Sequence, residues 1–168
     1  QRCQGVIDEW NRVSTQTSAN IRRAVHKRAD ETTQAYELAR DCVKDFLNAP
    51  AREEIIFTSG TTAAVNLVAF SFGEAFVHQG DEVIVSEAEH HSNIVPWQMM
   101  CHRKGAFLKV LPVDESGHLK VNDLEGLLND KTRIMAVTQI SNVLGIVNPI
   151  SEIISVCHSK NVPVLVDG

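Results

Sequence analysis

The strongest constraint on the fold is a regular alternation of short apolar runs with helical patterns along the 168-residue chain. The apolar runs, rich in valine and isoleucine, occupy residues 55–58, 82–86, 107–113, 133–140 and 162–166. A parallel strand pair needs a crossover of a dozen or more residues, and right-handed crossovers place helices on both faces of the sheet. The sequence therefore predicts a three-layer α/β/α fold with a mostly parallel sheet.

Helical periodicity between these runs predicts which helix faces are buried. Over residues 34–47 the apolar side chains recur every three or four positions, which predicts one buried face made of Ala35, Leu38, Ala39, Cys42, Val43, Phe46 and Leu47. The helix that opens after residues 59–62 is apolar on nearly every side, which is typical of a helix enclosed in a core. Further helices are predicted over 93–103, 122–128 and 150–157, the last two behind the capping patterns Asn122–Glu125 and Asn148-Pro149.

Composition and charge exclude several classes of protein. Lys and Arg number 16 against 21 Asp and Glu, and 43% of the residues are apolar, so the chain is mildly acidic and can form one core. Because no cationic cluster is present, we expect no nucleic-acid partner. No apolar run approaches the roughly 20 residues of a membrane span, and the N-terminus lacks a signal-peptide pattern, so we expect no membrane association.

The four cysteines are scattered, without the spacing of a zinc site or of a disulfide framework. Cys42 and Cys157 fall on apolar helix stripes, where a free thiol behaves as a small hydrophobic side chain. We therefore expect a reducing intracellular compartment, foremost the cytoplasm, with an organelle matrix or stroma as the alternative.

Both ends of the sequence lead us to expect a fragment. The chain begins Gln1-Arg2 without a methionine, and it stops at Gly168, directly after an apolar run and one aspartate. A buried parallel strand normally has neighbouring strands and a following crossover. We therefore expect these residues to be the N-terminal part of a larger protein.

Polar residues follow four of the predicted strands. In open α/β sheets the ligand crevice lies beyond the carboxyl ends of the strands. The residues in that position are Ser59–Thr62, Glu89–Asn93, Ser141-Asn142 and Asp167. We therefore expect the chemistry of this chain at that edge of the sheet.

The turn Ser59-Gly60-Thr61-Thr62 combines free backbone N–H groups, a helix N-terminus, hydroxyls and a glycine, a set that suits a phosphate. The alternative is an ordinary helix cap. His90 and His91 are neighbours, so at most one of them faces a small ligand, either stacking on a planar cofactor or moving a proton. The alternative is a surface histidine pair, and a metal site is disfavoured because no third ligand is suggested nearby.

Asp167 emerges from an apolar run, and a buried carboxylate needs a partner, such as the protonated nitrogen of a heteroaromatic ring. The alternative is the cap of a following helix. Asn142 offers an amide to a ring substituent or a carboxylate, with an ordinary turn residue as the alternative. Together these groups are the contacts that pyridoxal 5'-phosphate (PLP) requires.

Four stretches of the sequence carry a resemblance to a known family. Residues 87–98 read EAEHHSNIVPWQ, residues 141–145 read SNVLG and residues 164–168 read VLVDG, with FTSGTT at residues 57–62. These strings closely resemble the cysteine desulfurases of the class V aminotransferase family, and the resemblance runs from about Asn20 to the last residue. It implies the fold of fold-type I PLP enzymes. Residues 1–168 would then comprise an N-terminal arm, about 1–26, and the first part of the large domain, without the rest of that domain and the small C-terminal domain.

The resemblance implies a role for each candidate residue. Gly60, Thr61 and Thr62 would contact the PLP phosphate. His90 would stack on the pyridine face, as the catalytic residue of this part of the chain. Asn142 would contact both the ring and the substrate carboxylate, Asp167 would pair with the pyridinium nitrogen, and Arg23 would contact the substrate from the arm. At the neighbouring arm positions, here Arg22 and Ala24, the family usually has histidine and glycine.

The resemblance also implies an activity for the parent protein. It would convert L-cysteine to L-alanine and an enzyme persulfide, for iron–sulfur cluster assembly or other sulfur-cofactor assembly, as a homodimer that serves a sulfur-acceptor protein. The lysine that binds PLP covalently and the persulfide cysteine lie downstream in the family, so the chain alone is expected to be inactive. The alternatives are a selenocysteine lyase or another class V enzyme, a non-catalytic phosphate-binding α/β module, and a degenerate member that acts only as a binding partner.

Overall fold

The computed structural model describes residues 3–17 and 27–168. The chain divides into two compact units, Gln1–Phe57 and Thr58–Gly168. The predicted boundary of the arm near residue 26 stays a prediction, because residues 18–26 lie outside the described part.

The second unit is built on a four-stranded sheet in the order β2-β1-β3-β4. The strands are β1 (Glu82–Ser86), β2 (Phe107–Leu111), β3 (Thr132–Thr138) and β4 (Val164–Asp167). All three pairings are parallel, in the register Val83↔Leu108, Ile84↔Met135 and Val137↔Val166. The predicted parallel sheet is therefore confirmed.

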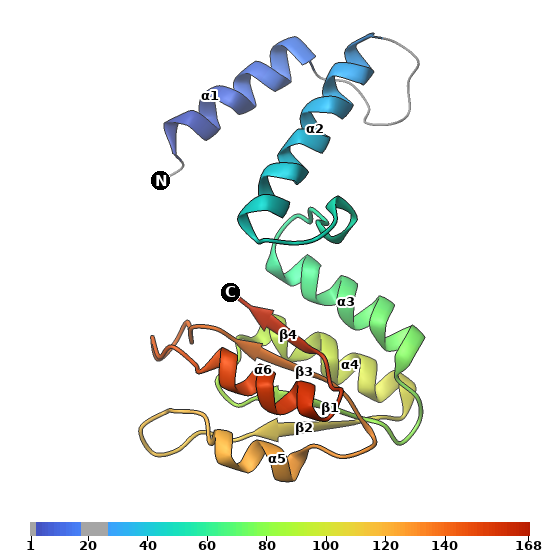
Figure 1. Ribbon diagram of the computed structural model, residues 1–168, viewed down its shortest axis with the longest axis vertical. Coiled ribbons are helices and arrows are strands. Elements are labelled where there is room, and N and C mark those ends of the chain that lie inside the picture. Colours follow the sequence, from blue (N-terminus) through green and yellow to red (C-terminus); the bar gives the residue numbers. More distant parts are fainter. Residues whose placement is uncertain (1–2, 18–26) are drawn as a thin grey trace. The chain divides into compact units, whose positions relative to one another are not determined.

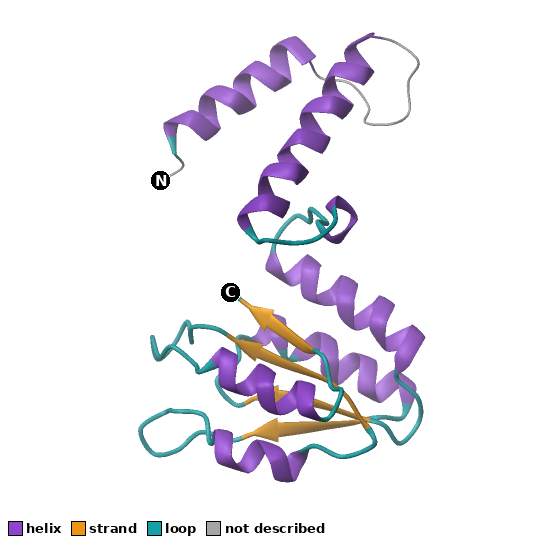
Figure 2. Ribbon diagram, viewed as in Figure 1, coloured by secondary structure: helices purple, strands orange, loops and turns teal. Residues whose placement is uncertain are grey.

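Helices cover both faces of this sheet, as Figures 1 and 2 show. One face carries α3 (Thr61–Phe76) and α4 (Val95–Lys104), and the other carries α5 (Leu124–Leu127) and α6 (Ile150–Ser159). Short 3-10 turns, η3 (His91–Asn93) and η4 (Val121–Asp123), precede α4 and α5. This is the three-layer α/β/α arrangement that the sequence predicts.

Strand side chains alternate between two apolar clusters, one under each helix layer. Val83 and Val85 of β1 pack with Trp97 and Met100 of α4, whereas Ile84 packs on the opposite face with Ile153 of α6. Because both faces are covered, the central strands read as continuous apolar runs.

The first unit is helical. It contains α1 (Gln4–Arg12), the π-helix η1 (Val13–Thr17), α2 (Lys27–Phe46) and the 3-10 turn η2 (Arg52–Glu54). Arg40 of α2 is 9% exposed; its Nε donates to the carbonyl oxygen of Ile55 at 3.0 Å, and a terminal nitrogen donates to the carbonyl oxygen of Arg52 at 2.7 Å. Arg52 in turn pairs with Asp41.

Two sequence-based predictions about this region were wrong. Residues 55–58 form no strand, because their main chain is held against α2. The carbonyl oxygen of Ile55 accepts a hydrogen bond from Arg40, and the rings of Phe57 and Tyr36 pack edge to face with 5.6 Å between their centroids. The stripe of α2 is not buried by the described structure, since Leu38 is 64% and Phe46 88% exposed, and Cys42 is also exposed.

Three smaller predictions also need correction. The helix α3 buries only one face, through Val65, Ala69 and Gly73. The side chains of the two predicted capping patterns make no cap hydrogen bond at α5 or α6. Asn148 instead donates its side-chain amide to the carbonyl oxygen of Thr138 at 2.8 Å, which ties the start of α6 to the end of β3.

Among the described helices, none has the length and hydropathy that crossing a membrane requires.

Candidate functional site

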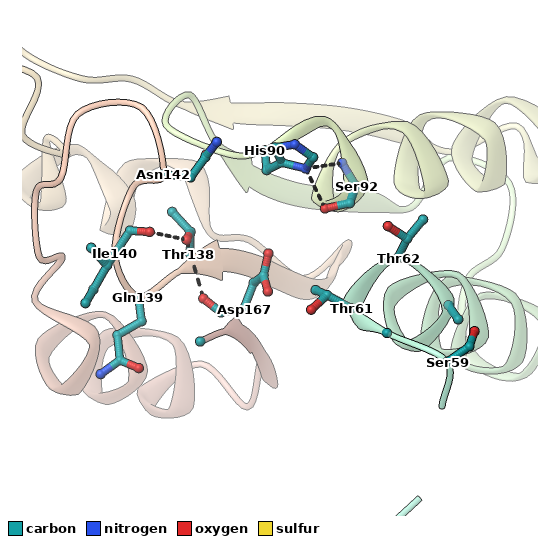
Figure 3. Close-up of a pocket in the computed structure, with 13 residues that line it drawn as sticks. Ser59, Thr61, Thr62, His90, Ser92, Thr138, Gln139, Ile140, Asn142 and Asp167 are labelled. Atoms are coloured by element: carbon teal, nitrogen blue, oxygen red, sulfur yellow. Dashed lines mark hydrogen bonds between the residues drawn. The ribbon is translucent and has the colours of Figure 1, made fainter. Parts of the chain in front are cut away.

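A pocket of about 510 Å³ opens in the second unit where β1, β3 and β4 end. Figure 3 shows the side chains that line it. The lining residues are Ser59, Gly60, Thr61, Thr62, Ala63, His90, Ser92, Thr138, Gln139, Ile140, Asn142, Asp167 and Gly168. The candidates to which the resemblance gives a role in the described part, Gly60, Thr61, Thr62, His90, Asn142 and Asp167, therefore meet at one site.

The sheet order explains why the pocket lies here. The chain leaves β1 toward β2 on one side and leaves β3 toward β4 on the other, so the strand order reverses between β1 and β3. Crossovers that diverge on opposite faces leave a crevice at the carboxyl ends of those two strands. His90 follows β1 and Asn142 follows β3, which places both at the crevice.

One wall of the pocket is the N-terminus of α3. Gly60 is the N-cap residue, with φ 152° and ψ 176°, a conformation that is essentially restricted to glycine. Its side-chain position is open space, and no side chain caps the helix. The first N–H groups of this 16-residue helix thus remain available to an anion, next to the hydroxyls of Thr61 and Thr62.

His90 and His91 have different environments. Nδ1 of His90 accepts a hydrogen bond from the main-chain N–H of Ser92 at 3.1 Å and lies 2.8 Å from the Ser92 hydroxyl. Because Nδ1 is the acceptor, the proton of the neutral ring is on Nε2. His90 lines the pocket, whereas His91 is not among the lining residues. The structure thus shows which of the two histidines lines the pocket.

Asp167 ends β4 beside the end of β3. Its carbonyl oxygen accepts from the Gln139 N–H at 2.7 Å and from the Thr138 hydroxyl at 3.4 Å. These main-chain contacts leave the carboxylate directed into the pocket, between His90 and Thr61 in Figure 3. A negative charge therefore lies on the pocket floor, well placed for a cationic group of a ligand.

Asn142 lies in the loop between β3 and α6. The loop is closed by the Gly145 N–H donating to the carbonyl oxygen of Ser141 at 2.8 Å and by the isolated bridge between Ile140 and Val147. Asn142 is an exposed turn residue and also lines the pocket. The two interpretations from the sequence, a turn residue and an amide available to a ligand, are therefore compatible.

Sequence reasoning assigned no role to Glu89, Ser92, Thr138 or Gln139. Glu89 is a half-buried carboxylate directly before His90. Burial raises its pKa, against the lowering effect of hydrogen bonds from Ser86, Asn93 and Thr138, and the nearby charge of Asp167 raises it further. An acidic residue three positions after the last residue of the largely buried strand β1 was the signal that could have found it.

Other predicted elements of the site fall outside this pocket. Arg23 lies outside the described residues. Within the described ranges, the lining of the pocket includes no lysine and no cysteine. In residues 3–17 and 27–168, metal-binding side chains do not gather in groups of three or more.

Comparison with known proteins gives the family. The family model "Aminotransferase class-V" matches residues 1–168. A cysteine desulfurase of Enterobacter sp. (strain 638) is 46% identical over 168 residues, which are 100% of this chain and 41% of that protein. A cysteine desulfurase of Synechococcus elongatus is 45% identical over 168 residues, again 100% of this chain but 27% of that protein. The chain thus spans less than half of the length of these curated relatives.

Solved structures agree with this result. The cysteine desulfurase CsdA of Escherichia coli superposes with a TM-score of 0.86 at 35% identity, over 99% of this chain and 42% of that one. The apo cysteine desulfurase of Thermococcus onnurineus NA1 superposes with a TM-score of 0.89 at 31% identity, over 98% and 40%. Since the family model matches over the full 168 residues, this chain belongs to the class V aminotransferase family.

Proposed function

We propose that this chain is the cofactor-binding part of a PLP-dependent cysteine desulfurase. The observation that carries the proposal is the pocket itself, which places an anion-binding helix N-terminus, a histidine ring and a carboxylate around one space. The similarity to cysteine desulfurases over the whole chain supports the choice of substrate.

The residues present fit PLP by the chemistry of their groups. PLP carries a phosphate at one end and a pyridine nitrogen, protonated when paired with an acid, at the other. The uncapped N-terminus of α3, with Gly60, Thr61 and Thr62, suits the phosphate. The carboxylate of Asp167 suits the protonated nitrogen, and His90 suits the ring face between them.

Bound PLP supplies an electron sink for negative charge that develops at the substrate Cα. Asp167 keeps the proton on the ring nitrogen, which makes the sink effective. His90 covers one ring face and excludes water from it. Asn142 orients the ring substituent and the substrate carboxylate through its amide.

The overall reaction takes the sulfur atom of L-cysteine onto a cysteine thiol of the enzyme, leaving L-alanine and a persulfide. We place the PLP-binding lysine and the acceptor cysteine beyond this chain. The pocket described here lacks both, so residues 1–168 alone are expected to be inactive. We further propose L-cysteine as substrate, a homodimer, a sulfur-acceptor protein and a cytoplasmic location for the parent protein.

The test is PLP binding and turnover by the full-length protein that contains this chain. We expect a visible absorption band of bound PLP, and equal amounts of alanine and reducible sulfur from L-cysteine. Asp167→Ala should abolish turnover. Turnover of L-selenocysteine but not L-cysteine would reassign the substrate, and PLP binding without either reaction would favour a non-catalytic module. Retained activity in Asp167→Ala would refute the role of that carboxylate.

A further inference from the structure

Glu89 lies behind the wall of the pocket and contacts three parts of the chain. Its Oε1 accepts from the main-chain N–H of Thr138 at 2.8 Å and from the hydroxyl of Ser86. Its Oε2 accepts from the side-chain amide of Asn93 at 2.7 Å. One carboxylate therefore joins the ends of β1 and β3 to the turn η3.

The third contact extends into the core. Asn93 is 0% exposed, and its Oδ1 accepts from the indole N–H of Trp97 at 3.1 Å. Trp97 is itself fully buried in the cluster between α4 and the sheet. The position of Glu89 is thus set in part by contacts that reach the packed core.

These contacts connect the two groups proposed to hold the PLP ring. His90 directly follows Glu89 in the chain. Thr138, whose N–H binds Glu89, is paired with Asp167 across β3 and β4, and its hydroxyl lies 3.0 Å from the carbonyl oxygen of Ile140 and 3.4 Å from that of Asp167. The carboxylate of Glu89 therefore links His90, the residue proposed to face the ring, through Thr138 to Asp167, the residue proposed to lie at the ring nitrogen.

Hydrogen-bond chemistry requires an acceptor at this position. The main-chain N–H of Thr138 can only donate. The amide of Asn93 is oriented by Trp97, whose N–H must donate to Oδ1, so the NH₂ group of Asn93 faces Glu89. A carboxylate accepts from both, whereas the amide of a glutamine would set one NH₂ group against another.

We propose that Glu89 is a positioning residue that sets the separation and angle between the His90 ring and the Asp167 carboxylate. The proposal rests on the proposed function, because the consequence of this positioning is the affinity and orientation of PLP. Glu89 does not line the pocket, so it acts through His90 and Thr138 and not by touching the cofactor.

The test compares Glu89→Gln with a matched control in the full-length protein. Glu87→Gln is the control, since Glu87 belongs to the same turn, does not line the pocket and accepts from the Val113 N–H at 2.9 Å on the exposed side. Three quantities are measured: the PLP dissociation constant, the visible circular dichroism of bound PLP, and amide hydrogen exchange over residues 86–93 and 138–142 in the apo protein. Thermal melting of the apo protein reports folding.

We expect Glu89→Gln to weaken PLP binding about tenfold, the size expected for a misfit at a buried charged hydrogen bond. The visible dichroism should fall, and hydrogen exchange should rise over both segments. Glu87→Gln should match the wild type in all three. The double variant E89Q/N93D exchanges the carboxylate and the amide, which restores a donor for each acceptor, and should recover PLP affinity and dichroism.

Unchanged affinity and dichroism in Glu89→Gln would overturn the proposal. So would a loss of affinity without any change in dichroism or exchange, since that would indicate a general loss of stability. If Glu89→Gln does not fold, E89Q/N93D decides: a folded double variant with wild-type PLP dichroism supports the proposal, and one with altered dichroism contradicts it. Failure of the wild type to bind PLP would refute the proposed function, and the exchange data on the apo proteins would still show whether Glu89 orders both segments.

Discussion

Gly73 of α3 lies against Met100 of α4 so closely that no methyl group fits between them. A Cβ built on Gly73 would lie 2.5 Å from Cγ and 3.0 Å from Sδ of Met100. The two helices form one layer on the sheet, and the N-terminus of α3 forms a wall of the pocket. The close approach at Gly73 therefore helps to determine where that wall lies relative to the turn that carries His90.

Gly73→Ala should destabilise the protein by about 1–2 kcal/mol, because the strain of overpacking exceeds the gain in helix propensity. The control is Gly126→Ala in α5, where the new methyl group meets nothing within 4 Å. That change should stabilise by about 0.5–1 kcal/mol. Denaturant titration of the apo protein measures both. Equal stability of Gly73→Ala and the wild type would mean that Met100 moves aside without cost.

His90→Ala should weaken PLP binding about tenfold through the loss of ring stacking, and His91→Ala should leave it unchanged. The reason is that His90 lines the pocket with its ring held by Ser92, while His91 does not line it. Fluorescence titration with PLP measures both constants. An equal effect of the two substitutions would contradict the assignment of His90 to the ring face.

Asp81 should make stability depend on pH. Its carboxylate accepts hydrogen bonds from Arg133 at 2.8 Å and from the main-chain N–H of His78 at 2.8 Å. Both contacts lower the pKa of Asp81, and the contact with Arg133 has the larger effect. A lowered folded-state pKa contributes stability that is present above the unfolded value of about 4 and is lost as the pH falls through the folded value.

Asp81→Asn should therefore cost about 1–3 kcal/mol at pH 7, with the difference from the wild type shrinking as the pH falls below about 4. Urea titrations of both proteins at several pH values check this. Asp130→Asn, at an exposed position in the turn before β3, is the control and should show little difference at any pH. A difference between Asp81→Asn and the wild type that grows at low pH would contradict the sign of the effect.

Much of the second unit could be predicted because its strands are covered on both faces. The apolar run at 82–86 coincides with β1, and the runs at 107–113, 133–140 and 162–166 overlap β2, β3 and β4 within a few residues. The run at 55–58 has the same composition, but it forms no strand. The carbonyl oxygen of Ile55 accepts from the guanidinium of Arg40 in α2, and no local sequence pattern predicts this contact.

Topology was enough to predict where the candidate site lies, but not which contacts hold its residues in place. The rule that ligands bind at the carboxyl ends of parallel strands selected His90, Asn142 and Asp167, which follow or end β1, β3 and β4, and the pocket contains all three. Gly60 was selected behind residues 55–58, which form no strand, and it lines the pocket as the N-cap residue of α3. The roles of these residues toward PLP remain proposals. The role of Glu89 was missed because one of its partners, Thr138, is 49 residues away. Its other two partners are Ser86 at the end of β1 and Asn93 in η3.

The sequence by itself determined the fold class and the edge of the sheet where the site lies, since both follow from the order and periodicity of local elements. Only the tertiary structure decided that His90 and not His91 faces the pocket, and that one carboxylate links β1, β3 and η3. Hydrogen bonds between residues distant in sequence depend on strand order and on the direction of each turn. Strand order and turn direction are decided when the helix layers pack on the sheet, and neither produces a periodic pattern in the sequence.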